Sequence, residues 1–226
     1  MTRLFTIFLT SLGSKIVVAF TGLVLAGFVV FHMLGNLQVF QGADALNTYA
    51  AVLREFPILL WSARIGLLLI AAIHIGVTIR LAIYNRRARP IGYAMHEYRK
   101  ASFFSRTMVL TGSFLLLFII FHLLHFTAGI VDTSFADRLD VKGHRDVYAK
   151  VVHAFHNPWL VALYLAAQAI VGVHLIHGVT SSLQTLGFEH PLFNRLFAAA
   201  GPLVAGAVVL GNTAIVLAIA LGMIHS

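Results

Sequence analysis

Histidines within apolar runs are the residues of this chain whose type and spacing best suit chemistry. Four of them each lie 16 or 17 residues beyond the start of a long apolar segment: His32, His74, His122 and His174. An ionisable side chain at such a depth in a membrane is costly and is by default a functional candidate. If successive segments cross in opposite directions, His32 and His122 share one layer. His74 and His174 then share a second layer, and two imidazoles per layer predict bis-histidine ligation of two haem groups.

The composition predicts a membrane protein. Of the 226 residues, 59% are hydrophobic and 11% are charged, which is more apolar surface than a soluble domain of this length can bury. The net charge is +8, but the charges cluster between the apolar runs, so we interpret them as topology signals and expect no nucleic-acid partner. The chain has no cysteine, so any haem is held without thioether bonds and no thiolate-held Fe–S cluster is expected in this chain.

Five apolar stretches are long enough to cross about 30 Å of hydrocarbon. Lipid admits only helices and closed barrels, so the predicted fold is an all-α polytopic helical bundle. Pro57 and Pro158 suit the first turn of a helix. We expect residues 1–226 to form a single domain, with spans at about 15–39, 58–84, 106–131, 158–183 and 197–223.

The distribution of charge predicts the orientation. The 85–106 connection carries six Arg or Lys residues against one Glu, and the N-terminal segment adds Arg3 and Lys15. The 36–57 and 132–157 connections hold six of the eight acidic residues. By the positive-inside rule, the N-terminus and the 85–106 connection are cytoplasmic, and the C-terminus lies outside.

The sequence repeats itself with a period of about 90 to 100 residues. TGLVLAGFVVFHML from Thr21 matches TGSFLLLFIIFHLL from Thr111, and YAAVLREF from Tyr49 matches YAKVVHAF from Tyr148. Each copy is expected to be one helical hairpin with two of the four histidines, so the first four helices form two repeated hairpins about a pseudo-twofold axis along the membrane normal. The fifth span is rich in Ala and Gly, and we interpret it as scaffold.

Two further histidines compete for the role of ligand. His125 and His177 each lie three residues beyond a proposed ligand, on nearly the same helix face. The shared depth offset favours His122 and His174, so we interpret the other two as neighbours of the haem groups, near propionates or a haem edge. Spacing alone leaves either member of each pair open.

Three stretches resemble the cytochrome b membrane anchor of succinate dehydrogenase/fumarate reductase, in its five-helix, two-haem, single-chain class (the b558 family). They are KIVVAFTGLVLAGFVVFHMLGN from Lys15, SRTMVLTGSFLLLFIIFHLLHF from Ser105 and NPWLVALYLAAQAIVGVHLIHGVTSSLQTLGFEHP from Asn157. The resemblance covers nearly the whole chain, and its most specific motif is HxxHG…S…TLG from His174 to Gly187.

The resemblance implies a complete electron-transfer assembly. His32 and His122 would hold a distal haem b toward the outside, and His74 and His174 a proximal haem b nearer the cytoplasm. An Fe–S subunit and an FAD-containing flavoprotein would dock on the cytoplasmic side of a bacterial cytoplasmic membrane. Electrons would be exchanged with a membrane quinone, commonly menaquinone. The dicarboxylate chemistry would lie in the partners, so no catalytic residue is expected here; the direction of the reaction and any higher oligomer of the complex stay open.

Further polar residues are assigned by depth alone. Asn36, Glu55 and Arg64 are candidates for a quinone site near the outer layer, although Glu55 equally suits a solvated acid in a connection. Haem propionates need cationic or hydroxyl partners. The residues near span ends that suit this role are Lys15, Arg64, Arg106 and Ser181.

Other functions remain as alternatives. A b-type anchor of a hydrogenase or a formate dehydrogenase also holds two haems, but the duplication and the fourth-span motif argue against it. A transporter with a histidine relay would gather its ionisable groups around one midplane site, whereas these histidines form two layers. A cofactor-free anchor would be colourless.

Overall fold

The computed structural model describes residues 10–88, 103–135, 137–188 and 190–225. Within these ranges the fold is all-α, and five helical stretches are long and apolar enough to cross a membrane, which fits a multi-pass membrane protein. These stretches are α2 (Ser11–Asn36) with the 3₁₀ segment η1 (Leu37–Gln41), α4 (Pro57–Arg87), α6 (Met108–His122) with the π-helical segment η2 (Leu123–Thr127), α8 (Pro158–Thr185) and α9 (Asn194–Ala220).

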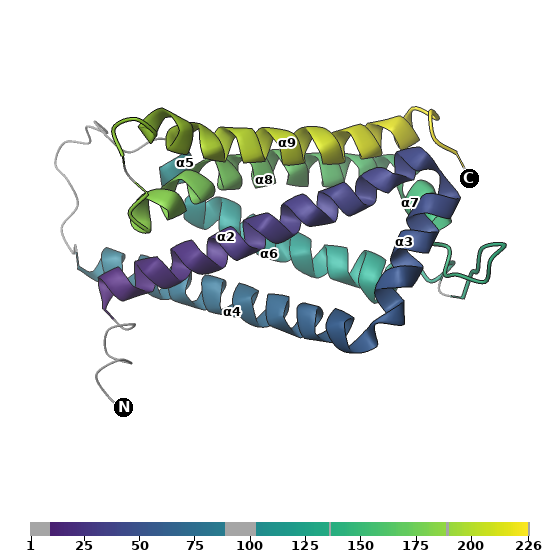
Figure 1. Cartoon of the computed structure of the whole chain (residues 1–226), viewed down its shortest axis with the longest axis horizontal. Coiled ribbons are helices and arrows are strands. Elements are labelled where there is room, and N and C mark those ends of the chain that lie inside the picture. Colours follow the sequence, from purple (N-terminus) through teal and green to yellow (C-terminus); the bar gives the residue numbers. More distant parts are fainter. Residues whose placement is uncertain (1–9, 89–102, 136, 189, 226) are drawn as a thin grey trace.

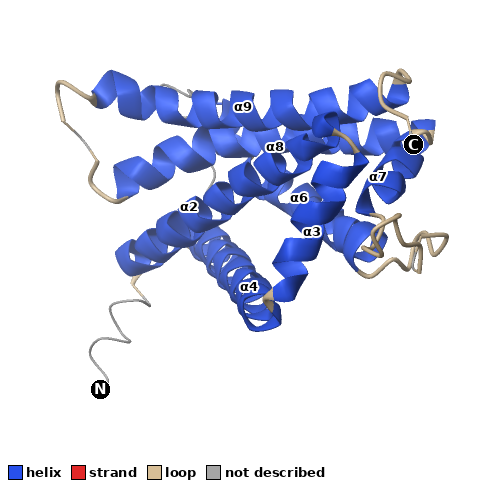
Figure 2. Ribbon diagram, turned by 45° about the vertical axis from the view of Figure 1, so that its right-hand side comes forward, coloured by secondary structure: helices blue, strands red, loops and turns tan. Residues whose placement is uncertain are grey.

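The long helices lie along one another and reverse direction from each to the next (Figure 1). The short helices α3 (Ala43–Glu55) and α7 (Val147–Phe155) lie at the same end of the bundle as the C-terminus. The short helix α5 (Phe103–Arg106) lies at the opposite end, where α2 begins. Both views show α8 and α9 side by side (Figure 2).

The starts of α4 and α8 agree with the sequence, whereas α2 begins about four residues earlier than predicted, at Ser11, and other bounds also differ. Pro57 and Pro158 occupy the first turns of α4 and α8, as predicted. The third span was expected to reach residue 131, but its helical part ends with η2 at Thr127, because the chain then turns at Gly129, whose φ is 67°. The fifth span lies about three residues earlier than predicted, at Asn194–Ala220.

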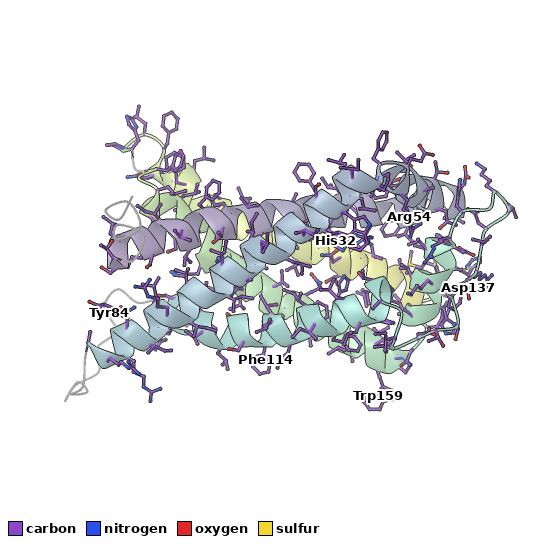
Figure 3. All side chains as sticks on the ribbon, turned by 90° about the horizontal axis from the view of Figure 1, so that it is seen from below. His32, Arg54, Tyr84, Phe114, Asp137 and Trp159 are labelled. Atoms are coloured by element: carbon purple, nitrogen blue, oxygen red, sulfur yellow. The ribbon has the colours of Figure 1, made fainter. Side chains whose placement is uncertain are left out.

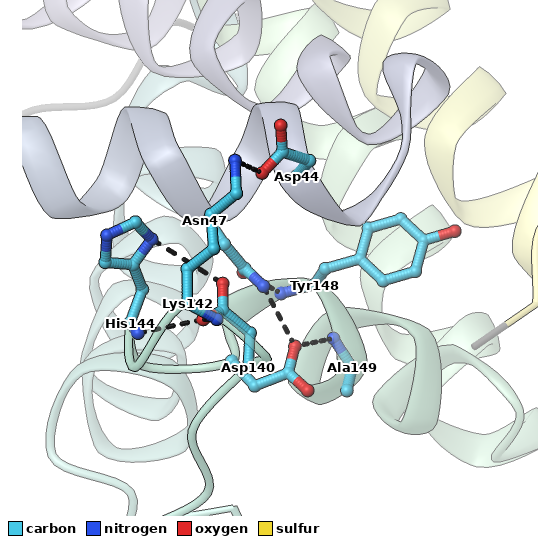
Figure 4. A network of polar contacts seen from close by, with 8 residues as sticks. Asp44, Asn47, Asp140, Lys142, His144, Tyr148 and Ala149 are labelled. Carbon is cyan, nitrogen blue, oxygen red and sulfur yellow. Dashed lines mark hydrogen bonds and ion pairs between the residues drawn. The ribbon is translucent and has the colours of Figure 1, made fainter.

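The two acidic connections, which the sequence suggested only as links, each contain a helix. Asn47 of α3 joins them: its Nδ2 donates to Asp146 Oδ1 (3.2 Å), and its Oδ1 accepts from the backbone amide of Tyr148 (2.9 Å). Asp146 also caps α7 by accepting from the amide of Ala149. Figure 4 shows Asn47 against the start of α7 at Tyr148. Only 1% of Asn47 is exposed. These bonds hold α3 against α7. Because α4 begins at Pro57, shortly after α3, and α8 begins at Pro158, shortly after α7, the bonds also connect the starts of α4 and α8.

The tightest packing is between α8 and α9. A Cβ on Gly201 would collide with the carbonyl oxygen of Ile176 and the hydroxyl of Thr180, so only glycine allows this close approach. Pro202 follows inside α9 and leaves the carbonyl of Ala198 without its usual helical donor. The Thr180 hydroxyl lies 3.1 Å from the carbonyl oxygen of Ile176 and 3.5 Å from that of Ala198, so its one proton can be shared between the two.

The outer surface is apolar, and α4 is the least buried helix. Phe114 and Trp159 point away from the bundle, while Arg54 and Asp137 lie at the α3–α7 end (Figure 3). No residue of α4 is buried. The side chains of α4, including those on the side that faces the other helices, are therefore at least partly accessible.

Candidate functional site

The histidines of α2 and α6 form the first pair. The ring centroids of His32 and His122 lie 5.9 Å apart, with an angle of 87° between the ring planes. Two imidazoles that each bind one metal ion at about 2.0–2.1 Å place their centroids roughly 6 Å apart. An edge-to-face contact between rings covers the same range. The separation thus accommodates a shared metal ion without by itself requiring one.

The ring nitrogens of this pair have well-defined partners. The amide nitrogen of Asn36 lies 3.3 Å from His32 Nε2 and can only donate, so that Nε2 carries a lone pair. His122 Nδ1 lies 3.3 Å from the hydroxyl of Tyr164, which leaves its Nε2 for another partner. His32 is exposed and His122 is half-buried. Asn36 therefore lies beside the histidine pair, and not at a separate site.

His125, the competitor of His122, is packed against the same tyrosine. It is 1% exposed, and its Nδ1 lies 3.0 Å from the Tyr164 hydroxyl. The ring centroids of Phe126 and His125 lie 4.3 Å apart, with their planes inclined by 36°. His125 lies within η2, where the wider π-turn shifts its direction relative to the α-helical His122. The geometry favours His122 as the partner of His32, with His125 and Tyr164 forming the wall behind it.

The histidines of α4 and α8 form the second pair, and each contacts the Thr-Gly of the preceding long helix. The hydroxyl of Thr21 lies 3.0 Å from His74 Nδ1, and the hydroxyl of Thr111 lies 3.1 Å from His174 Nδ1. The two rings are near enough that positive charges on both would repel each other. A Cβ on the glycine that follows Thr21 would lie 3.1 Å from His74 Cε1.

The two pairs lie at different levels of the bundle. Thr21 precedes His32 on α2 by 11 residues, and Thr111 precedes His122 by the same number. Eleven residues correspond to about 16 Å of helix. The α4–α8 pair, which contacts these threonines, is therefore separated from the α2–α6 pair by about that rise along the helices.

His177, the competitor of His174, lies against α9. It lines a cavity of about 190 Å³ with Phe104 and Pro202, among others. His174 instead contacts α6 through Thr111. The structure thus brings His74 to Thr21 and His174 to Thr111, whereas His177 lies at the cavity beside α9.

The remaining sequence candidates lie near the helix ends. Lys15 and Arg106 are exposed at the end where α2 begins, and Glu55 is the exposed last residue of α3. Arg64 is exposed, and its guanidinium lies 5.2 Å from the Trp61 ring centroid. Most of the basic 85–106 connection lies outside the described residues. Ser181 is half-buried.

Sequence reasoning missed Ser182 and Tyr164. Ser182 is 8% exposed, and its Oγ lies 3.7 Å from where a Cβ on Gly22 would be. It therefore lies near His74, whereas the sequence pattern points to its neighbour Ser181. The only signal for Tyr164 was a hydroxyl in an otherwise apolar run.

A second cavity, of about 270 Å³, lies at the α3–α7 end. Its polar lining comprises His125, Asp132, His153 and Asn157, and its apolar lining includes Leu160. His153 Nε2 lies 3.7 Å from Asp132 Oδ2. The backbone amide of Ser134 donates a hydrogen bond to Asp132, and the Ser134 hydroxyl adds a second, smaller contribution. Both lower the pKa of Asp132 below its usual range, so this carboxyl is ionised at neutral pH. Neither Glu55 nor Arg64 lines this cavity.

Chemically, each histidine pair could supply two imidazole donors to a metal ion. Two imidazoles without thiolates are the axial donor set of a b-type haem, whose porphyrin supplies the other four nitrogens. A structural zinc site would need four protein ligands. The glycine next to His74 allows the imidazole to lie close to α2. Comparisons of the chain with family models, with curated proteins and with solved structures find no match.

Proposed function

We propose that this chain is the dihaem cytochrome b membrane anchor of a succinate:quinone oxidoreductase. The observation that carries the proposal is the presence of two histidine pairs at two levels, each joining alternate long helices. The matching contacts of Thr21 with His74 and of Thr111 with His174 support two repeated hairpins. The sequence resemblance supplies the identity of the complex.

In this proposal His32 and His122 are the axial ligands of an outer haem b. His74 and His174 are those of an inner one. When bound, the two haems supply one-electron transfer across the membrane. Lys15 and Arg106, at the inner end, and Arg64, at the outer end, have the charge that haem propionates require. Burial, and after it repulsion from Arg145 and Arg64, lowers the pKa of Arg54. Three neighbouring guanidinium groups favour the binding of a carboxylate, such as a haem propionate, between them.

The orientation and the partners follow from the charges. The N-terminus and the basic 85–106 connection face the cytoplasm and, with the 184–196 segment, dock an Fe–S subunit that carries a flavoprotein. The acidic connections with α3 and α7 then face outside. This arrangement is that of a bacterial cytoplasmic membrane complex, and it agrees with the positive-inside rule.

The quinone, menaquinone in this proposal, binds in the cavity at the α3–α7 end. Its apolar lining suits the ring, and its polar lining suits the two carbonyl groups. Tyr164 contacts both His125, in the cavity wall, and His122. The cavity is therefore adjacent to the outer histidine pair. The ionised Asp132 and its neighbour His153 can accept and release the protons of quinone chemistry. Of the residues we selected by depth, Asn36 lies beside His32, at the same level.

Replacing Asp132 with Asn tests this cavity. We expect the rate of quinone reduction to fall about 100-fold, because the reduction takes up two protons and a carboxyl group that takes protons from water and passes them to the quinone is lost, while the haem content stays unchanged. The assay is steady-state quinone reduction by the purified complex. Asp137→Asn removes an exposed acid from the same connection and should leave the rate within about twofold of the wild type. Equal rates in the two variants would place the quinone elsewhere.

Gly22→Ala tests the packing around the inner pair. The new Cβ would lie 3.1 Å from His74 Cε1, so the imidazole must shift, and we expect retention of the inner haem to fall about tenfold. Gly27→Ala, on the same helix, meets nothing within 4 Å and serves as the control. Both changes favour the helix by about 1 kcal/mol. A loss that is confined to Gly22→Ala therefore reports the contact, and equal haem retention in both variants would contradict it.

The identity of the complex is tested by its electron donor. Membranes containing the complex should show haem reduction on addition of succinate and none with formate or hydrogen. The flavoprotein and the Fe–S subunit should copurify with this chain. Reduction by formate or hydrogen, with no response to succinate, would assign the anchor to another dehydrogenase.

A further inference from the structure

Two threonine hydroxyls contact the inner histidines in the same way. Thr21 Oγ1 lies 3.0 Å from His74 Nδ1, and Thr111 Oγ1 lies 3.1 Å from His174 Nδ1. Both threonines are buried, with 6% and 8% of their surface exposed. Each lies on the long helix that precedes the helix of its histidine, so the same contact occurs once in each hairpin.

The count of protons fixes the direction of these hydrogen bonds. The Thr21 hydroxyl lies 2.7 Å from the carbonyl oxygen of Val17, and the Thr111 hydroxyl lies 3.0 Å from that of Thr107. A carbonyl only accepts, so a hydroxyl that donates to it offers its oxygen as an acceptor to the histidine. In this arrangement the hydroxyl oxygen accepts from the Nδ1–H of the histidine. A neutral imidazole has one N–H, so Nε2 of His74 and of His174 carries the lone pair.

We infer that Thr21 and Thr111 are positioning residues that hold His74 and His174 in the tautomer able to bind iron through Nε2. The inference rests on the proposed function, in which these two histidines ligate the inner haem. A hydrogen bond donated by Nδ1–H fixes the orientation of the ring and raises the basicity of the ligating nitrogen. A more basic ligand favours the ferric state, so the two threonines lower the midpoint potential of the inner haem.

A simpler role for these threonines would be bonding to their own helix. Threonine in membrane helices commonly donates to the carbonyl one turn earlier without any further function. Thr78 does so with the carbonyl of His74 (2.7 Å), and Thr107 does so with that of Phe103 (3.1 Å). Thr21 and Thr111 differ by their second contact, to an imidazole nitrogen. Thr78 and Thr107 are thus matched controls that separate the two roles.

The experiment replaces the hydroxyl acceptor with a methyl group of similar size. Thr21→Val and Thr111→Val, singly and together, are compared with Thr78→Val and Thr107→Val in the purified chain. A potentiometric titration follows the inner haem, and the outer haem serves as the internal reference. At a fixed ambient potential, we expect the ratio of reduced to oxidised inner haem to rise at least about threefold in each test variant, and the haem affinity to fall about tenfold. Serine at either position should restore both values, and the control variants should change neither.

Several results would overturn the inference. One is an unchanged potential and affinity in the double valine variant, and another is an equal shift in the control variants. If a valine variant does not accumulate, cysteine at the same position replaces it. The cysteine sulfur accepts hydrogen bonds more weakly than a hydroxyl, so threonine, cysteine and valine form a series of decreasing acceptor strength. An intermediate shift is expected there, and no shift would overturn the inference. A colourless wild-type chain would contradict the proposed function itself. A coloured wild-type chain whose valine and cysteine variants keep the wild-type potential and haem affinity would contradict only the role of the threonines.

Discussion

Replacing His122 with Ala is expected to halve the haem content of the purified chain, whereas His125→Gln leaves it at the wild-type value. His122 is the histidine whose ring lies 5.9 Å from that of His32. His125 is buried against Tyr164 and Phe126. Glutamine keeps a hydrogen-bonding group near the Tyr164 hydroxyl, so this control preserves the packing. The measurement is haem b per chain by pyridine haemochrome, together with low-temperature difference spectra.

The loss in His122→Ala should be confined to one spectral component, and His32→Ala should remove the same component. Agreement between these two variants would assign both histidines to one haem. The reverse outcome, in which His125→Gln loses a haem and His122→Ala retains both, would move the ligand by three residues into η2. The assignment of His122 would then be wrong.

His174→Ala is expected to remove the other haem and to lower succinate-driven quinone reduction on the order of 100-fold or more. Loss of a residue that only orients a metal ligand already lowers affinity or activity by about 10- to 100-fold, and His174 is here the ligand itself. His74→Ala should have the same effect. His177→Ala is the control, because His177 faces the cavity beside Phe104 and Pro202.

The outer haem provides the folding control for this experiment. It should remain in His174→Ala at the wild-type amount, because its ligands lie about 16 Å away along the helices. Complete loss of both haems in His174→Ala would mean that the variant is misfolded, and the smaller change His174→Tyr then repeats the test. A fully active His174→Ala beside an inactive His177→Ala would contradict the assignment of the α4–α8 pair.

The sequence predicted the apolar framework well, because length and hydropathy decide it. Pro57 and Pro158 mark helix starts through their fixed φ and missing N–H, which act locally. The pairing of His32 with His122 was predicted from depth, since both follow their helix starts by a similar number of residues. The structure places these two rings in contact. Local rules and a regular helical rise were sufficient for these predictions.

The remaining features depend on contacts between distant segments. The helices α3 and α7 are held by Asn47, which bonds to residues about 100 positions away, and no local pattern reports such a partner. His125 lies within the π-helical segment η2, so its position relative to His122 differs from the one that an α-helical count gives. Likewise, Tyr164 became a candidate only once the fold showed both histidines around its hydroxyl.

The most direct test of the central claim is the absorption and electron paramagnetic resonance spectrum of the purified chain, with haem quantified per polypeptide. The proposed ligation predicts two haem b per chain, both low-spin with two imidazole ligands, and no reaction with carbon monoxide, since iron with two histidine ligands has no open position. A colourless preparation that is folded and membrane-inserted would contradict the account. A single high-spin haem that binds carbon monoxide would contradict it equally.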